Sequence, residues 1–485
     1  MKIRSVKANY ILNIIRAFSY ALITILTMPY INKTLGPVNI GKVEFANTVI
    51  NYFILLSGLG INIYGIREIA RVRDSKKRRD KTTLELLLIL SITSVVAYVL
   101  LFVIIYQFGF FSSYIDLLIL MSIMIALTNM GAEWYFQGME DQLYITIRYV
   151  GVRILALILI FFMIKEPQDY YIYAAILVLI VCGSNIFNLY FLVKEIDFSS
   201  FTINELNLKQ HFKPLLTIFI AAISVNIYLQ LDNFMISSVS GDLYLGYYSV
   251  ANKLIRFVIT FITIVGMVLL PRLSKLYSED RVLYMQYLRS AFYFILNLAL
   301  PSTIVFFVFA KNITMLFAGS QFEPAIITMQ ILSPLCIIVG IAYFLGYLVL
   351  YTQGSEKVYT RAVIISAVFS LLSNLIAIKY YQQNGAAVVA VLSELFAILI
   401  MTYFAKDSLK ELQIINTNFF KICAGGMVVF LLAMLTNIIF ETESLFNSVI
   451  IILLTYFLYG LLMLACKEEV SYSIGRIIKQ KISTK

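Results

Sequence analysis

Charged residues are scarce in this chain. Asp, Glu, Lys and Arg together make up 13% of its 485 residues, whereas soluble domains carry about 25%. Hydrophobic residues account for 61% of the sequence, and the mean hydropathy is +0.87. This composition excludes an ordinary soluble domain and predicts an all-α integral membrane protein.

Histidine and cysteine are also rare. The four cysteines (Cys182, Cys336, Cys423 and Cys466) lie in apolar segments without metal-ligand spacing, so we predict small core residues and no disulfide framework. The single histidine, His211, stands at the start of an apolar span, where we predict a boundary residue, and one histidine alone makes no zinc site. We therefore expect no metal and no cofactor.

Long apolar runs fill most of the chain. A helix needs about 20 apolar residues to cross a bilayer, and on that measure we predict fourteen spans. They lie near residues 8–29, 43–66, 84–107, 115–137, 146–165, 171–193, 213–239, 246–270, 288–310, 325–351, 361–381, 385–405, 419–440 and 447–466. No connection exceeds about twenty residues, which leaves no room for a soluble catalytic domain and predicts that the protein is not an enzyme.

The distribution of Lys and Arg predicts the orientation of the spans. Most of the 38 basic residues fall in alternate connections and at both ends of the chain, so the positive-inside rule predicts that both termini are cytoplasmic. The net charge of +11 is then explained without nucleic acid. We interpret the run RVRDSKKRRDK (71–81) as a topological anchor that faces anionic lipid.

An internal repeat divides the chain. Five residues of the second half match five of the first at a constant offset of 205 positions. The pairs are Gly241 with Gly36, Gly246 with Gly41, Ala251 with Ala46, Asn252 with Asn47, and Arg272 with Arg67. A repeat after six spans keeps its orientation, so we predict two six-helix bundles related by a parallel pseudo-repeat. The expected domains are 1–193, a cytoplasmic linker at 194–212, 213–406, and two extra helices with a cytoplasmic tail at 407–485.

Polar stripes mark where the spans face one another or a cavity, because a polar side chain in hydrocarbon needs a partner or water. The stripes lie on the first, second, seventh and eighth spans. From them we predict a central passage between the bundles, lined by Asn13, Tyr20, Asn47, Asn51, Asn226, Gln230, Asn252 and Thr260.

Charges within the spans are mostly positive. Arg16 continues the stripe of the first span, and Arg256 lies ten residues into the eighth, where a lipid-facing charge costs ~2.5–3.5 kcal/mol. We predict that both line the passage, with Lys253 one turn from Arg256. Such an excess of cations suits an anion, above all phosphate.

The acidic residues in the spans leave alternatives open. Asp232 either binds a proton or sodium ion or pairs with Arg256 or Lys253, and Glu133 either caps a helix or pairs with Arg16. Snorkelling to the cytoplasmic surface is at least as good an interpretation for Arg148 and Arg153, which we do not place in the passage.

Two phrases carry a resemblance to a known family. EWYFQGMED (133–141) and LDNFMISSVSGDLYLGYYSVANKLIRF (231–257), with the span count and the half-repeat, resemble the Wzx-type polysaccharide-repeat-unit flippases. These form the polysaccharide transporter branch of the multidrug/oligosaccharidyl-lipid/polysaccharide superfamily. The resemblance covers essentially the whole chain and implies bundles that alternate between inward-open and outward-open states. It also implies that Arg16 and Arg256 hold the substrate's pyrophosphate. The related lipid II flippases carry further basic residues on the second span, where this sequence has Asn47 and Asn51.

The resemblance implies a function and a setting. The substrate would be an undecaprenyl-pyrophosphate-linked oligosaccharide, moved from the inner to the outer leaflet of a bacterial plasma membrane for surface polysaccharide synthesis. Membrane lipids and other polysaccharide-assembly proteins are the expected partners. A cation-coupled multidrug exporter of the same superfamily remains an alternative, as does an intramembrane glycan polymerase or ligase.

Overall fold

The computed structural model describes residues 6–197, 201–202, 205–439 and 445–472. Every regular element within these ranges is a helix. Eleven described segments are long and apolar enough to cross a membrane. This confirms an all-helical membrane protein, while the arrangement of fourteen spans remains a prediction.

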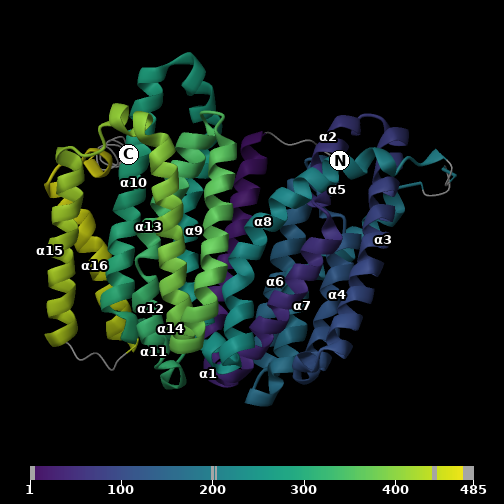
Figure 1. Ribbon diagram of the computed structural model, residues 1–485, viewed down its shortest axis with the longest axis horizontal. Coiled ribbons are helices and arrows are strands. Elements are labelled where there is room, and N and C mark those ends of the chain that lie inside the picture. The colour runs from purple at the N-terminus through teal and green to yellow at the C-terminus, as the bar shows by residue number, and fades with distance from the viewer. Residues whose placement is uncertain (1–5, 198–200, 203–204, 440–444, 473–485) are drawn as a thin grey trace, which may run out of the picture. The chain divides into compact units, whose positions relative to one another are not determined.

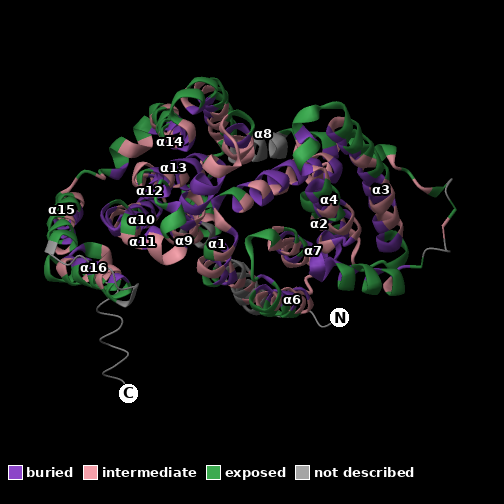
Figure 2. Cartoon of the chain, turned by 90° about the horizontal axis from the view of Figure 1, so that it is seen from below, coloured by how far each residue is buried: buried purple, intermediate pink, exposed green. Residues whose placement is uncertain are grey.

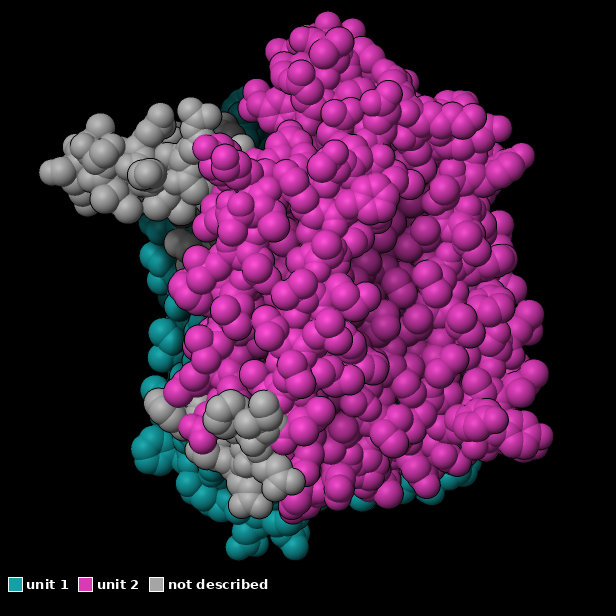
Figure 3. Space-filling view, turned by 90° about the vertical axis from the view of Figure 1, so that its left-hand side faces the viewer, with its two compact units in different colours: residues 1–237 teal, residues 238–485 magenta. Residues whose placement is uncertain are grey.

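The chain forms two compact units, residues 1–237 and 238–485, shown in different colours in Figure 3. The division falls within the helix that covers the seventh predicted span. The helices that begin in unit 1 are α1 (Val6–Gly58), α2 (Ile61–Val72), α3 (Lys76–Gln107), η1 (Gly109–Tyr114), α4 (Ile115–Met130), α5 (Glu133–Gly138), α6 (Gln142–Met163), η2 (Pro167–Asp169), α7 (Tyr170–Glu195) and α8 (Lys209–Ser240).

Unit 2 contains the remaining helices, which Figure 1 draws from teal to yellow. They are α9 (Asp242–Glu279), α10 (Arg281–Val308), α11 (Ala310–Phe317), η5 (Ser320–Phe322), α12 (Ala325–Leu332), α13 (Leu335–Tyr343), η6 (Phe344–Tyr351), α14 (Glu356–Leu412), α15 (Thr417–Ile439) and α16 (Leu445–Ala465).

Two glycines explain where the repeated halves turn. Gly36 lies inside α1 at φ 74°, ψ 169°, and Gly241 lies just before α9 at φ 100°, ψ 168°. Only glycine adopts this backbone region without strain. The two glycines are one of the pairs that match at the 205-residue offset, so the sequence repeat is also a repeat of backbone conformation. A second interruption, at Gln382 within α14, separates the two spans predicted there.

Buried polar contacts hold unit 1 together. The Asn129 side-chain amide on α4 donates to the hydroxyls of Ser57 on α1 (2.8 Å) and Ser94 on α3 (2.7 Å). One buried residue thus joins three helices, because its hydrogen bonds have no competition from water in the hydrocarbon region.

In unit 2, α10 is the central helix. Figure 2 shows it mostly buried, whereas α15 and α16 expose much of their surface. Two tyrosines of α16 attach that helix to α10: Tyr456 donates to the Ser302 hydroxyl and Tyr459 to the Asn297 side-chain oxygen, each at 2.9 Å.

Two expectations need correction. All four cysteines are free, but only Cys182 and Cys336 are buried, while Cys423 on α15 and Cys466 just after α16 are exposed. In the basic run 71–81, Arg79 and Asp80 are buried rather than turned toward lipid. Arg79 lies between Asp80 and Glu195, at 3.6 and 3.5 Å, because its charge needs counter-ions once it is desolvated.

Candidate functional site

Arg256 is the most isolated of the predicted site cations. It lies on α9 and is half-buried, while Leu254, Ile255 and Ile259 beside it are buried and apolar. Its Nε donates to the Asn252 side-chain oxygen one turn earlier, at 3.4 Å. Among the described residues no carboxylate forms an ion pair with this guanidinium, so its charge is available to an anion.

The rest of the α9 stripe surrounds this cation. Ser249 is buried, Asn252 and Lys253 are half-buried, and Thr260 is exposed. The Thr260 hydroxyl donates to the Arg256 carbonyl (2.9 Å), which leaves its oxygen lone pairs accessible. These residues all lie on α9, and Asn252 contacts Arg256, while their place in a passage remains a prediction.

Arg16 has a different environment in unit 1. Its Nη1 lies 2.7 Å from Glu133 Oε1, and the two side chains are 23% and 21% exposed. Of the two alternatives left open for Glu133, the structure therefore has the ion pair. The guanidinium also lies 5.5 Å from the Tyr149 ring centroid, within cation–π range.

Glu133 is saturated with donors. Besides Arg16, it accepts hydrogen bonds from the Gln137 amide (2.7 Å) and from the Tyr149 hydroxyl (2.9 Å). The Arg16–Glu133 ion pair is thus part of a partly solvated hydrogen-bond network and not an isolated surface contact.

Arg153 is the residue that sequence reasoning missed. It is buried, its Nη1 donates to the Arg16 carbonyl and the Ser19 hydroxyl at 3.0 Å each, and its guanidinium lies 4.6 Å from the Tyr149 ring centroid. Snorkelling is therefore wrong for this arginine. Thr146, Tyr149 and Arg153 recur at helical spacing on α6, a stripe that could have indicated the site. The network holds two arginines and one carboxylate, so it is net positive.

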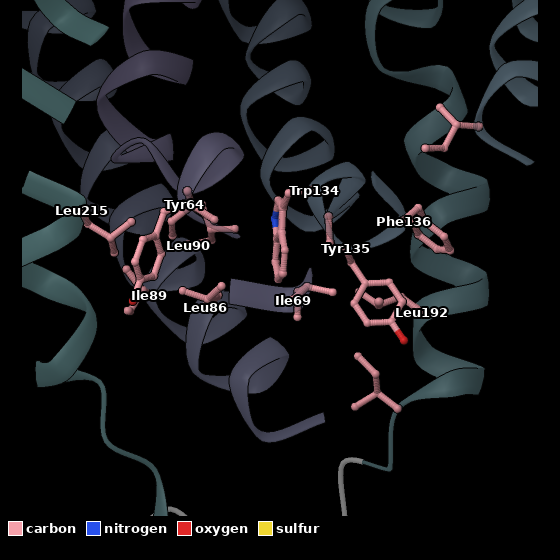
Figure 4. Close-up of a cluster of buried hydrophobic side chains, with 14 residues drawn as sticks. Tyr64, Ile69, Leu86, Ile89, Leu90, Trp134, Tyr135, Phe136, Leu192 and Leu215 are labelled. Carbon is pink, nitrogen blue, oxygen red and sulfur yellow. The ribbon is translucent and has the colours of Figure 1, made fainter. Parts of the chain in front are cut away.

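The sequence EWYFQG explains how Glu133 is positioned. Trp134, Tyr135 and Phe136 on the short helix α5 are buried in one apolar cluster, and Figure 4 shows Trp134 close to Ile69 within it. A Cβ added at Gly65 would lie 2.7 Å from the Trp134 ring, so only glycine admits this contact. The aromatic residues anchor α5, and Glu133 at its first position is held against Arg16.

The stripe on α8 makes contacts inside unit 1. Thr48 on α1 donates to the Gln230 side-chain oxygen (3.4 Å) and accepts from the Asn233 amide (3.3 Å). Helix packing thus accounts for part of this stripe. Asn47 and Asn51, on either side of Thr48, are half-buried.

The other predicted residues are placed less fully. Asp232 is half-buried on α8 and lies within electrostatic range of the Tyr52 hydroxyl. The side chains of Asn13, Tyr20 and Asn226 lie outside the described part of the structure.

Comparisons with known proteins agree on a family. Residues 6–277, more than half of the chain, match the family model described as polysaccharide biosynthesis protein. The putative O-antigen transporter of Escherichia coli (strain K12) is 22% identical over 83% of this chain and 97% of its own length. That of Shigella dysenteriae is 23% identical over 78% and 95%.

Solved structures agree on the fold. The lipid II flippase MurJ, in an inward closed conformation, aligns with a TM-score of 0.67 at 16% identity, covering 94% of this chain and 99% of its own. An inward-facing multidrug resistance MATE family transporter of the MOP superfamily aligns at 0.61 with 15% identity, covering 83% and 99%. At such identities the likeness shows the fold alone.

Proposed function

The chain belongs to the polysaccharide biosynthesis protein family, and from that membership we propose that it moves undecaprenyl-pyrophosphate-linked oligosaccharides from the inner to the outer leaflet of the bacterial plasma membrane. The family match and the helical fold support a multi-pass membrane transporter of the Wzx flippase type. The fourteen-span arrangement with cytoplasmic termini and alternating access belongs to this proposal.

The observation that carries the proposal is the environment of Arg256. A half-buried guanidinium held by Asn252 among the apolar residues of α9, with no ion-paired carboxylate among the described residues, lacks a counter-ion there. Such a charge is costly unless an anion completes it. A pyrophosphate offers the planar, bidentate oxygen pairs that arginine binds best.

The Arg16 ion pair is also compatible with a phosphate substrate, because one anion can replace another on the guanidinium. Glu133 occupies Arg16, and an incoming phosphate replaces the carboxylate on the guanidinium. Gln137 and Tyr149 keep Glu133 satisfied while this happens, since both donate to it independently of Arg16. In this proposal Arg16, Lys253 and Arg256 bind the pyrophosphate. Asn13, Tyr20, Asn47, Asn51, Asn226, Gln230, Asn252 and Thr260 bond sugar hydroxyls.

The test compares Arg256→Ala with Arg256→Lys in cells that lack the native protein. Loss of a charge-assisted hydrogen bond costs ~1.5–3 kcal/mol, so we expect the Ala variant to cut export at least about 10-fold. The lipid-linked oligosaccharide accumulates inside, identified by mass. Lys retains the charge without the bidentate geometry and should give intermediate export. Equal membrane levels of both variants serve as the control, and unchanged export by the Ala variant contradicts the proposal.

A multidrug exporter of cations would need a site with the opposite charge. A cationic drug needs carboxylates at its site, whereas unit 1 holds Arg16 and Arg153 beside Glu133, and in unit 2 Arg256 pairs with no carboxylate among the described residues. The charge balance therefore favours an anionic substrate. Drug-resistance assays with and without a sodium gradient separate the two functions: protection that depends on sodium and survives Arg256→Ala supports the exporter.

A further inference from the structure

Three tyrosines occupy one face of a π-helix in unit 2. Tyr343 ends α13, and Tyr347 and Tyr351 belong to η6, which has π-helical hydrogen bonding along its eight residues. The rings of Tyr343 and Tyr347 are stacked at 4.7 Å, and those of Tyr347 and Tyr351 at 5.9 Å, with interplanar angles of 20° and 18°. Extended π-helix is rare and is frequent at functional sites. We call these residues the tyrosine row.

The tyrosine row is the side of η6 that the protein leaves uncovered. Tyr347 is half-buried and Tyr351 is 43% exposed, whereas the other six residues of η6 are buried. Exposed positions along the middle of the first span of the neighbouring helix α14 are aliphatic instead, as at Val368, Leu372 and Ile376, while the exposed tyrosines of α14 (Tyr380, Tyr381 and Tyr403) lie near span ends. A lipid-facing surface needs the aliphatic pattern, so the uncovered face of η6 has a different purpose.

An interfacial aromatic belt does not explain the row. Tyr351 lies at the end of the span and fits a belt, but Tyr343 lies eight residues, or about two helical turns, deeper. Among the described residues, neither Tyr343 nor Tyr351 has a hydrogen-bond partner for its hydroxyl. An unpartnered hydroxyl at that depth is unfavourable unless it meets water or a polar ligand.

Two glycines make room for the row. A Cβ at Gly266 of α9 would lie 2.0 Å from Cε1 of Tyr343, and a Cβ at Gly346 would lie 2.5 Å from Cδ2 of Tyr359. Tyr359 of α14 then brings a fourth ring to 5.2 Å from that of Tyr347. At both places the absence of a Cβ leaves the space that a tyrosine ring occupies.

The tyrosine row packs against α9, the helix that carries Arg256. Gly266, which Tyr343 contacts, is ten residues beyond Arg256 on α9, or ~15 Å. No residue of α13 or η6 is charged, so the row suits a neutral, hydroxyl-rich ligand rather than a phosphate. Several linked sugar rings span such a separation.

We propose that Tyr343, Tyr347 and Tyr351 form a sugar-binding track that contacts the oligosaccharide while Arg256 binds its pyrophosphate. This inference rests on the proposed function and adds that different residues bind the glycan and the phosphate. The phenol hydroxyls exchange hydrogen bonds with sugar hydroxyls, and the polar edges of the stacked rings line the same path. The track recognises the glycan, and the arginine recognises the lipid phosphate.

The test measures the affinity of the purified full-length protein for two probes by native mass spectrometry. One probe is the lipid-linked oligosaccharide extracted from cells that lack this protein, and the other is undecaprenyl pyrophosphate without sugar. For the triple variant Y343F/Y347F/Y351F we expect at least about 10-fold weaker binding of the first probe, since each lost hydrogen bond is worth about 2- to 10-fold. Binding of the second probe should not change.

Two variants keep the result interpretable. Tyr403→Phe removes an exposed hydroxyl from α14 of the same unit and should alter neither affinity. Tyr351→Phe alone, at the most exposed position of the row, should weaken glycan binding about 2- to 10-fold. If the triple variant melts at a lower temperature than the wild type, this single variant is used in its place.

The outcomes separate the two proposals. If the wild type binds the oligosaccharide probe and the Phe variants bind it equally well, the track is wrong and the proposed function stands. Equal losses for both probes also overturn the track, because the hydroxyls then act on the fold or the phosphate. If the wild type prefers neither probe to phosphatidylglycerol, the proposed function fails, and the track fails with it.

Discussion

Arg16 and Arg256 differ in what surrounds their guanidinium groups. Arg16 is neutralised by Glu133 at 2.7 Å, whereas Arg256 is oriented by the uncharged Asn252. A phosphate can bind Arg256 directly, but it must compete with a carboxylate for Arg16. In the proposed function, Arg256 would therefore favour tight binding of the phosphate. Glu133 would favour its release from Arg16, because the carboxylate competes for the same guanidinium.

This difference predicts the behaviour of Glu133→Gln. Glutamine has the same shape but no charge, and its amide NH2 opposes the donors of Arg16, Gln137 and Tyr149. We expect undecaprenyl pyrophosphate to bind several-fold more tightly, because Arg16 loses its competitor. Transport should slow, since release becomes harder. Both are measurable, as affinity in detergent and as flipping in proteoliposomes.

A matched control is available at the surface. Glu140 pairs with Arg73 at 2.9 Å, with side chains 44% and 32% exposed, so Glu140→Gln removes a similar charge from a solvated pair. It should change neither affinity nor rate. Weaker pyrophosphate binding by Glu133→Gln contradicts the competition between carboxylate and phosphate.

At the residue scale, the sequence predicted helical neighbours better than distant ones. Asn252 and Arg256 are one turn apart, and their contact follows from spacing alone. The stripe on α6 could have indicated Arg153, but not its partners, because Arg16 and Ser19 lie more than 130 positions away. The exposure of Cys423 was unpredictable for the same reason: which face of an apolar helix meets lipid depends on its neighbours.

At the scale of elements, a buried network fixes the start of α8 to the rest of unit 1. His211 near the N-terminus of α8 lies 2.8 Å from the Tyr64 hydroxyl on α2 and 2.9 Å from Glu85 on α3. Glu85 is 1% exposed and also accepts the backbone amide of Asn207 (2.8 Å) and the Gln210 side chain (3.0 Å). The linker is therefore tied down at a carboxylate that has no access to water.

We expect His211→Phe to destabilise unit 1 by about 2–4 kcal/mol, since it deprives a buried carboxylate of a donor. The ring packing is largely retained, so the loss reports on the hydrogen bonds to Glu85 and Tyr64. A lower melting temperature and faster proteolysis of the linker would be the measured effects.

Gln210→Ala is the comparison for this prediction. It removes a single side-chain hydrogen bond from the same carboxylate and should cost only about 1 kcal/mol. If His211→Phe is as stable as the wild type, the network is not what holds α8. The sequence showed His211 only as a boundary residue, because Glu85 lies 126 positions earlier.

Elements were predictable where local chemistry determines them. Helical residues make up most of the predicted spans within the described ranges, because long apolar runs satisfy their backbone groups inside helices. The predicted spans 43–66, 115–137 and 325–351 are nevertheless each divided between two or more helices. The matched glycines Gly36 and Gly241 also followed from the repeat. The π-helix η6 did not, since its sequence is an ordinary apolar run and its geometry depends on contacts such as that between Gly266 and Tyr343.

At the scale of the whole molecule, transport of the proposed pyrophosphate-linked substrate should depend on voltage, because the substrate itself is an anion. An inside-negative membrane contributes ~2.3 kcal/mol per charge per 100 mV to outward movement of an anion. Two phosphate charges thus gain roughly 4–5 kcal/mol on the same arithmetic, provided that no cation moves inward with them. If the substrate's charge is the only charge that moves, the membrane potential suffices to drive the proposed transport.

We therefore expect a membrane potential alone to redistribute the substrate. In proteoliposomes that contain the wild-type protein and the lipid-linked oligosaccharide, an inside-negative potassium diffusion potential should raise the fraction in the outer leaflet, and reversing the potential should lower it. Protein orientation does not affect this equilibrium, because the field acts on the charge and not on the direction of insertion. Arg256→Ala vesicles, which should equilibrate too slowly to respond, control for leakage. Redistribution that ignores voltage but follows a proton or sodium gradient would instead indicate counter-transport, for which Asp232 is the candidate carboxylate.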